Sequence, residues 1–429
     1  MKKSIQPYVL KLLSSDTLKY LRRRIHAVSR FLMGDVPTIN VFLRVDDPYS
    51  YLLVQALPSL AKRFDVAFKF VVITDIDEAM YPRPDLLQQY ALKDVLNLAE
   101  LYDMDFPMHA AIALDNKARM QLFAERLASI QDSPKFIVQA RYLLRAFWHN
   151  EIFEDLAPLD IEAAKFRLKQ NHLEMAKKGH YLGAMLYFEG EWYWGLDRLD
   201  HLERRLIEQK LSKSSNELVL FNLTYKGFCA NRQTYLAEPQ PLTLFWSARS
   251  PYSYIALERA VQLAAHYKLR LVIKPVMPMV MRGMQVPDTK KFYIFQDTKR
   301  EANKLGLSYG FVADPLGAAV ERCYALVEYA ESENKLIEFL LSFARGVNTE
   351  GIRADTDKGL EKIVSRCGLD WQVAKTKLDN TAWYSMTENN MDELNALGYW
   401  GVPVIRYGNM HFWGQDRLKI LENHIAEQL

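Results

Sequence analysis

The chain has 429 residues, which is enough for two or three domains that each bury a hydrophobic core. Its composition, 49% hydrophobic and 25% charged, is typical of a folded globular protein and excludes disorder, collagen and coiled coil. The sequence contains no run of about 18 apolar residues, so it predicts no membrane span. The net charge of +3 is too small to indicate a nucleic-acid-binding protein.

The N-terminal arm, residues 1–36, is strongly basic. Eight Lys or Arg residues and two acids give it a net charge of +6, which leaves −3 for the rest of the chain. Apolar residues recur at spacings of three and four, which predicts one face of a helix that Asp16 caps and Gly34 ends. This apolar stripe consists of Leu18, Leu21, Ile25, Val28 and Leu32.

Three interpretations of the arm remain open. We favour a helix that docks its apolar stripe on the body of the protein and leaves its arginines in solvent. The second is contact with an anionic membrane surface or another protein, and the third is an organellar transit peptide. The arm has no uninterrupted apolar segment, so it is not a secretory signal.

The rest of the chain contains an internal repeat. Shifted by 203 positions, Phe42–Tyr51 aligns with Phe245–Tyr254 and shares its Pro-Tyr-Ser-Tyr sequence. Shifted by 219, Trp194–Leu199 aligns with Trp413–Leu418. The chain therefore contains two diverged copies, and the second is longer, with the extra residues expected within 351–400.

Both copies predict the same order of elements. An apolar strand (39–45; 242–246) leads into a turn and a helix (49–63; 252–266) with Pro in its first turn. A second strand (67–73; 269–276) and about 100 mainly helical residues follow. A hairpin (185–194; 402–413) and a last helix close each copy.

This order predicts an α/β fold of two tandem thioredoxin-like domains, each with an inserted helical subdomain. The expected domain limits are 1–36 for the basic helix, 37–210 for the first domain, 211–238 for a connector and 239–429 for the second domain. Within the connector, residues 218–225 are apolar enough to pack as a strand or helix.

Three cysteines lie far apart in the sequence, namely Cys229, Cys323 and Cys367. There is no CxxC pair and no His/Cys cluster at metal-ligand spacing, so we predict neither a disulfide framework nor a metal site. We expect each cysteine to be a buried or partly buried small apolar side chain. The sparse, odd count is typical of a reducing compartment, and we expect a cytoplasmic protein.

Four motifs of the second copy resemble a known family. They are Ser250-Pro251-Tyr252-Ser253 after the first strand, Tyr293 with Asp297–Arg300, Gly401-Val402-Pro403, and Trp413–Leu418. In this combination the second copy resembles the DsbA-like branch of thioredoxin folds, most closely 2-hydroxychromene-2-carboxylate isomerase and the kappa-class glutathione transferases. The serines stand where disulfide oxidoreductases of this branch have Cys-Pro-x-Cys.

The resemblance implies glutathione as cosubstrate. Ser250, at a helix N-terminus that favours anions, would hold the glutathione thiolate. A cis Val402–Pro403 bond would let the Val402 backbone pair with the tripeptide. Gln415 and Asp416 would bind its γ-glutamyl end. The alternatives are purely structural roles: an N-cap at Ser250, a trans proline that starts an edge strand at Pro403, and a carboxylate that stabilises a helix start at Asp416.

Three further residues are candidates for substrate contact. Lys274 ends the second strand and would meet a substrate carboxylate, although a solvated lysine is the favoured interpretation. Ser253 is more typical of helix packing. Arg417 would form a salt bridge or face a neighbouring subunit.

The two copies depart from the family pattern in different ways. Residues 277–286 contain no Asn where the family often has a catalytic or glutathione-binding one, which puts isomerase chemistry in question. In the first copy, Asp47 stands at the Ser250 position and Ala184 at the cis-proline position. We therefore expect a non-catalytic first copy, so that one chain imitates a dimer.

The favoured function is a glutathione-dependent transferase or isomerase that acts on a small electrophilic substrate, of which an aromatic compound is one candidate. The alternative is a non-enzymatic binding or scaffold protein of the same fold. A dithiol oxidoreductase is excluded because neither turn has a cysteine. We expect no nucleic-acid partner and no metal.

Overall fold

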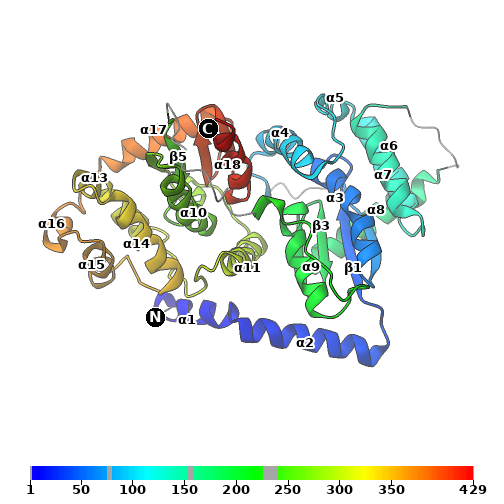
Figure 1. The fold of residues 1–429 in the computed structure, drawn as a ribbon, viewed down its shortest axis with the longest axis horizontal. Helices are drawn as coiled ribbons and strands as arrows, with labels where there is room; N and C mark the ends of the chain where they lie inside the picture. Colours follow the sequence, from blue (N-terminus) through cyan, green and yellow to red (C-terminus); the bar gives the residue numbers. More distant parts are fainter. Residues whose placement is uncertain (1, 75–79, 153–158, 226–238, 429) are drawn as a thin grey trace. The chain divides into compact units, whose positions relative to one another are not determined.

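The computed structural model describes residues 2–74, 80–152, 159–225 and 239–428. The chain forms two compact units (Figure 1). The N-terminal unit is Arg22–Lys226, and the C-terminal unit combines Met1–Leu21 with Gly227–Leu429. Among the described residues, no helix has both the length and the hydrophobicity needed to cross a membrane.

The N-terminal unit is built on a four-stranded sheet in the order β2-β1-β3-β4. β1 pairs with β2 in parallel and with β3 in antiparallel, and β3 and β4 form the predicted hairpin. Its elements are β1 (Thr38–Leu43), α3 (Pro48–Arg63), β2 (Ala67–Val72), α4 (Pro84–Tyr102), α5 (Ala111–Leu114), α6 (Lys117–Ser129), α7 (Phe136–Trp148), α8 (Ile161–Lys178), β3 (Met185–Phe188), β4 (Glu191–Trp194) and α9 (Leu199–Glu208).

The C-terminal unit repeats this topology, with strand order β6-β5-β7-β8. Three of its helices, α15 to α17, occupy the stretch where the sequence predicts the extra residues. Its elements are β5 (Leu242–Trp246), α10 (Pro251–Tyr267), β6 (Leu271–Pro275), α11 (Asp288–Lys304), α12 (Ala318–Ala325), α13 (Val327–Ser332), α14 (Leu336–Thr349), α15 (Asp357–Arg366), α16 (Trp371–Thr376), α17 (Trp383–Ala396), β7 (Val404–Tyr407), β8 (Met410–Trp413) and α18 (Leu418–Glu427).

The first strand of the C-terminal unit, β5, lies in the core of its sheet. Every residue of β5 is buried, so helices cover both faces of the sheet, as expected for a strand with a parallel neighbour. The hairpin turns also match the sequence. In the first hairpin, Glu189 and Gly190 both have positive φ, as in a type I′ turn. In the second, Gly408 has positive φ at the first turn position, as in a type II′ turn. These two turn types suit a two-residue hairpin.

The cysteines behave as small apolar residues where the structure describes them. Cys323 is fully buried in the core of the C-terminal unit, and burial raises the pKa of its thiol well above the ordinary value. Cys367 is partly buried. Cys229 and residues 226–238 of the predicted connector lie outside the described residues, and Leu223–Tyr225 form a short 3-10 helix at the end of its described part.

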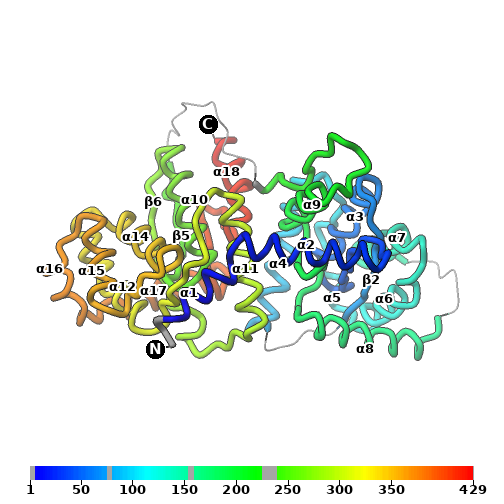
Figure 2. Tube along the Cα trace, turned by 90° about the horizontal axis from the view of Figure 1, so that it is seen from below, coloured from blue at the N-terminus to red at the C-terminus, as the bar shows by residue number. Residues whose placement is uncertain are grey.

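The arm forms two helices, α1 (Lys2–Leu13) and α2 (Asp16–Met33), shown in dark blue in Figure 2. In the C-terminal unit, the Tyr8 ring of α1 lies 5.2 Å from the Phe311 ring, and Asp16 accepts a hydrogen bond of 3.0 Å from Asn303. Gly34 has φ +68°, which confirms the predicted left-handed helix end.

The favoured interpretation of the arm is wrong, because α2 docks through its arginines. In the N-terminal unit, the Arg23 guanidinium donates to both carboxylate oxygens of Glu191 at 2.7 and 2.8 Å, and Arg30 forms an ion pair with Glu189. None of the α2 residues is buried. The surface beneath α2 is the acidic hairpin β3–β4. Its carboxylates pair with the guanidinium groups of α2, so the apolar stripe of α2 faces solvent.

Deleting residues 1–34 should leave both units folded. α2 contributes ion pairs rather than core, and α1 adds to the C-terminal unit mainly the buried Pro7 and the partly buried Leu10. Partly exposed ion pairs of this kind contribute about 1 kcal/mol or less each. We expect a free energy of unfolding lower by about 1–3 kcal/mol, with a cooperative transition retained. Urea unfolding followed by circular dichroism, full chain against deletion, measures this. Loss of the cooperative transition would show instead that the arm belongs to the core.

Candidate functional site

The candidate site begins at the turn between β5 and α10. Ser250 is the N-cap of α10, and its Oγ accepts a hydrogen bond of 3.2 Å from the Ser253 backbone N–H. Pro251 follows at the first helical position. A serine hydroxyl has one O–H and two lone pairs, so a cap that uses it as acceptor leaves the O–H for donation. Capping and thiolate binding are therefore compatible roles for the partly exposed Ser250.

Buried side chains hold this turn from behind. Ser253 is fully buried, and its Oγ accepts from the Ser247 N–H at 3.3 Å, so its side chain packs inside the turn. The Tyr324 hydroxyl accepts from the Ala248 N–H at 3.1 Å and donates to the Val276 carbonyl at 2.7 Å. Tyr324 thus ties the ends of β5 and β6 together.

A second contact joins the turn to α11. The Tyr252 hydroxyl donates to the buried Asp297 carboxylate at 2.7 Å, and Asp297 also pairs with Arg300. The first copy has the same contact at the aligned positions, where Tyr49 donates to Asp94 at 2.7 Å. The turn motif and the helix motif are therefore one structural unit in both copies.

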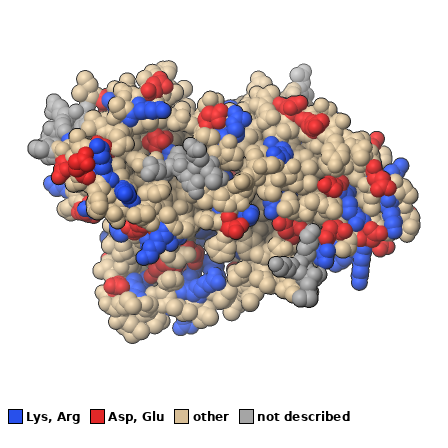
Figure 3. Space-filling model, turned by 180° about the vertical axis from the view of Figure 1, so that it is seen from behind, with Lys and Arg blue, Asp and Glu red and all other residues tan. Residues whose placement is uncertain are grey.

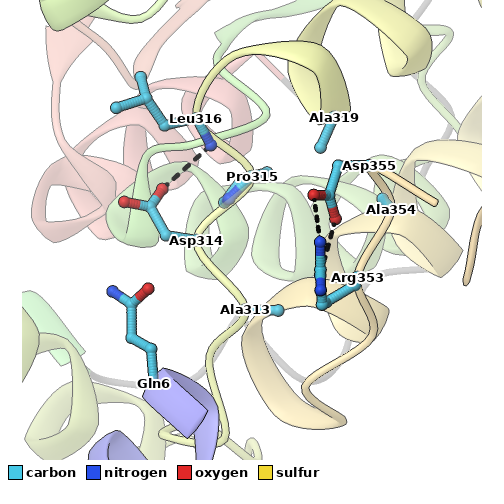
Figure 4. Close-up of a pocket in the computed structure, with 9 residues that line it drawn as sticks. All are labelled: Gln6, Ala313, Asp314, Pro315, Leu316, Ala319, Arg353, Ala354 and Asp355. Carbon is cyan, nitrogen blue, oxygen red and sulfur yellow. Dashed lines mark hydrogen bonds and ion pairs between the residues drawn. The ribbon is translucent and has the colours of Figure 1, made fainter. Parts of the chain in front are cut away.

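Arg249 anchors the turn on its exposed side. Its guanidinium donates to both carboxylate oxygens of Asp314 at 2.8 and 2.9 Å. Asp314 also accepts from the Leu316 N–H at 3.1 Å and lines a small cavity of about 170 Å³ (Figure 4). On the other side of that cavity Arg353 binds Asp355 through two hydrogen bonds of 3.1 and 2.8 Å. The cavity's charged groups are thus engaged with one another.

The loop before β7 reaches the same edge of the sheet. Val404 pairs with Phe245 near the carboxyl end of β5, so Pro403 lies beside the start of the Ser250 turn. The Val402–Pro403 peptide bond is cis, as the resemblance predicts. Pro403 is buried and Val402 is partly exposed. The Pro403 carbonyl accepts from the Gly414 N–H at 2.8 Å, which brings the start of the last helix to this edge.

Gln415 and Arg417 are buried at that helix start, and Asp416 is partly exposed. The Gln415 carbonyl accepts from Arg259 at 2.6 Å, and its amide donates to Glu301 at 3.0 Å and to Asp416 at 2.6 Å. The Gln415 side chain therefore links α10, α11 and Asp416. Ligand binding by Gln415 and Arg417 remains a prediction, and Asp416 is the group of the three that solvent reaches best.

Lys274 is paired rather than solvated. On β6 it forms an ion pair with Glu393 of α17, and Glu393 also binds Arg406 at 2.9 Å. Two cations thus share one carboxylate next to the carboxyl end of β6. This cluster keeps a net positive charge, which suits a carboxylate ligand, although a ligand would compete with Glu393 for Lys274.

The equivalent place in the first copy holds a carboxylate beside the loop backbone, and Asp47 is partly exposed, as Ser250 is. The Asp47 carboxylate accepts from the Ser50 hydroxyl at 2.8 Å and from the Tyr49 N–H at 3.2 Å. A side chain on Gly183 would meet that carboxylate at 2.4 Å, so the loop backbone covers it. Ala184 has φ +50°, and its N–H donates to Ser50 at 3.1 Å. Burial is the main cause that raises the pKa of Asp47 from 3.8 to about 6.

Comparison with known proteins finds a family match in the second copy. The family model for the DSBA-like thioredoxin domain matches residues 242–426, which is the second copy. No curated protein sequence matches the chain.

Solved structures of the same fold cover less than the whole chain. A 2-hydroxychromene-2-carboxylate isomerase is 22% identical with a TM-score of 0.39, over 43% of this chain and 94% of its own. A probable DsbA oxidoreductase from Streptomyces coelicolor is 17% identical with a TM-score of 0.36, over 44% and 89%. The thiol-disulfide exchange protein alpha-DsbA2 from Wolbachia pipientis is 15% identical with a TM-score of 0.32, over 54% and 97%.

Sequence reasoning missed Arg249, Asp314 and Tyr324, which hold the turn. The Tyr252–Asp297 contact could have been predicted from the sequence, because both residues recur in the first copy at the same shift of 203 positions. Residues 242–426 thus match the DSBA-like thioredoxin domain, and residues 38–208 repeat the sheet and helical insertion of this second copy.

Proposed function

We propose that the second copy is a glutathione-dependent transferase or isomerase. The observation that carries the proposal is the partly exposed Ser250 turn, where a helix N-terminus and a hydroxyl with an O–H to donate lie at the same edge of the sheet as Val402 and Asp416. A helix N-terminus favours an anion, and a thiolate is an anion that a hydroxyl can stabilise. The serines at positions 250 and 253 cannot form a disulfide, so dithiol exchange is excluded at this turn.

Each group has one task in this proposal. Ser250 donates to the glutathione sulfur and favours its thiolate form. The Val402 backbone pairs with the tripeptide, as one strand added to an edge. Asp416 binds the ammonium of the γ-glutamyl end.

The chemistry begins with addition of the thiolate to an electrophilic carbon. In a transferase reaction the new C–S bond remains, and a proton or a leaving group balances the charge. In an isomerase reaction the thiolate adds to an enone, and the former double bond becomes a single bond that rotates. The C–S bond then breaks and returns the electron pair, so that glutathione is regenerated. The positive cluster of Lys274 and Arg406 favours a substrate that carries a carboxylate.

A binding or scaffold protein is the second candidate. The observation in its favour is that residues 277–286 contain no Asn in the segment where the resembled family often has one. In addition, the Gln415 side chain is engaged within the protein. On this interpretation the second copy would bind glutathione without turnover or would not bind it at all.

Replacement of Asp416 by Asn tests the proposal through kinetics. A hydrogen bond between charged groups contributes about 1.5–3 kcal/mol, so we expect kcat/KM for glutathione to fall by about 10- to 100-fold, mainly through KM. The assay follows conjugation of glutathione to an enone. The matched control is Asp197→Asn at the aligned position of the first copy, which should leave kcat/KM unchanged.

The outcomes separate the candidates. Glutathione consumption no faster than in buffer, with tight binding by calorimetry, would favour the binding protein. A kinetic loss in Asp197→Asn without one in Asp416→Asn would show that the site is assigned to the wrong copy.

A further inference from the structure

The outward face of α2 is an apolar surface with arginines on both flanks. At 100° per residue, Leu21, Ile25, Val28 and Leu32 share one side of the helix. Arg23 and Arg30, which bind the hairpin β3–β4, lie on the opposite side. Arg22 and Arg24 fall between these sides, one on each flank of the stripe, and both are exposed.

The arm concentrates the exposed apolar side chains of the protein. Among the described residues, 26 large hydrophobic side chains are exposed, and 12 of them belong to the first 36 residues. Exposed apolar side chains gathered on one face of a helix mark a site of interaction. Helix α1 of the C-terminal unit contributes exposed Ile5, Val9 and Leu12 to this set.

The end of α2 indicates what covers this surface. Phe31, Leu32 and Met33 are 83%, 77% and 72% exposed. Consecutive helical residues point about 100° apart, so these side chains face three directions. A protein groove covers one side of a helix, whereas the acyl region of a lipid bilayer surrounds a shallowly inserted helix end on several sides.

Charge complementarity selects the kind of lipid. The arm has a net charge of +6, against −3 for the rest of the chain. On the face shown in Figure 3, Lys and Arg side chains mix with Asp and Glu side chains, without a continuous basic patch among the residues drawn in colour. A basic helix with an apolar outward face is the pattern of proteins that lie in the interface of a membrane with anionic lipids.

We infer that α2 binds the surface of membranes that contain anionic lipids. Its apolar stripe enters the boundary between headgroups and acyl chains, while Arg22 and Arg24 meet lipid phosphates. Arg23 and Arg30 keep the helix on the N-terminal unit, so the protein itself is brought to the membrane. This binding is independent of the Ser250 site and of any reaction there.

Vesicle sedimentation of the full chain tests the inference. The probes are vesicles of phosphatidylcholine with phosphatidylserine and vesicles of phosphatidylcholine alone. We expect binding to the first and about tenfold weaker binding to the second, with loss of the difference at high salt. The double substitution Ile25→Glu and Leu32→Glu should weaken binding to anionic vesicles by about tenfold or more. Arg22→Ala with Arg24→Ala should weaken it by about fivefold per arginine.

The matched control is Phe166→Glu on α8, which places the same charge at another exposed apolar side chain of the N-terminal unit. It should bind as the wild type does. All altered residues are exposed, so circular dichroism should show unchanged folds. The inference is overturned if the wild type ignores anionic vesicles, or if the Ile25/Leu32 variant binds them equally. It is also overturned if sedimentation velocity shows a dimer that this variant dissociates without any vesicle binding, since a second copy would then cover the stripe.

Discussion

Replacement of Ser250 by Ala is expected to raise the pKa of the bound glutathione thiol by about one to two units. The free thiol has a pKa of about 8.5, and a helix N-terminus with a hydroxyl donor lowers it. A hydrogen bond to a charged acceptor contributes about 1.5–3 kcal/mol, and one pKa unit corresponds to 1.36 kcal/mol. Ultraviolet titration of the thiolate in the complex, wild type against variant, measures the shift. Glutathione itself should still bind through Val402 and Asp416.

A second variant separates the two roles of Ser250, donation of a hydrogen bond to the thiolate and capping of helix α10. Ser250→Asp keeps a side chain that caps helices well, but it places a carboxylate beside the thiolate, as Asp47 does in the first copy. We expect this variant to keep its helix and lose the bound thiolate at neutral pH. A thiolate titration that is the same in the wild type, Ser250→Ala and Ser250→Asp would reduce Ser250 to a helix cap.

Replacement of Asp47 by Asn is expected to stabilise the N-terminal unit at neutral pH. In the folded chain the pKa of Asp47 is raised to about 6, mainly by burial, from an ordinary value of 3.8. The folded state therefore holds this proton more tightly than the unfolded state does. Ionisation of Asp47 costs no stability below about pH 4, costs more as the pH rises to about 6, and reaches its full cost above that.

The expected gain for Asp47→Asn is about 2–3 kcal/mol at pH 7 and close to zero at pH 4, at 1.36 kcal/mol per pKa unit. Urea unfolding at a series of pH values measures it as the difference between variant and wild type. Asp46→Asn is the control, because it removes the Arg44–Asp46 ion pair of 2.7 Å and should destabilise the fold. A gain for Asp47→Asn that does not vary with pH would contradict the account.

The sequence predicts the strands and hairpins well because the repeat supports each element twice. β5 begins and ends at the predicted residues, and the hairpin of β3 and β4 spans the predicted residues 185–194. These short apolar runs are bounded by turn residues, and alignment of the two copies removes much of the ambiguity between strand and helix. The Val402–Pro403 bond was predictable only through the resemblance, since few X–Pro bonds are cis in general.

The arm shows where the sequence pattern fails. A helical apolar stripe predicts which residues share a face, but not which face docks. That choice depends on the partner surface, and Glu189 and Glu191 come from a hairpin more than 150 residues away. Only the folded chain brings this acidic turn beneath Arg23 and Arg30.

The site shows a similar limit. The sequence identifies the turn, the proline loop and the helix start because each is a local motif. It does not identify Asp314 or Tyr324, which lie in the helical insertion and act on the turn through tertiary contacts. Burial also separates residues that are adjacent in sequence, since Gln415 and Arg417 are buried whereas Asp416 is partly exposed.

Calorimetric titration of the full chain with glutathione tests the central claim most directly. The account predicts one binding site per chain, because in the first copy the Asp47 carboxylate would repel a thiolate and the Gly183 backbone lies against that carboxylate. It also predicts that Asp416→Asn weakens this binding while Asp197→Asn leaves it unchanged. Two sites per chain, or no heat of binding in the wild type at any neutral pH, would contradict the account.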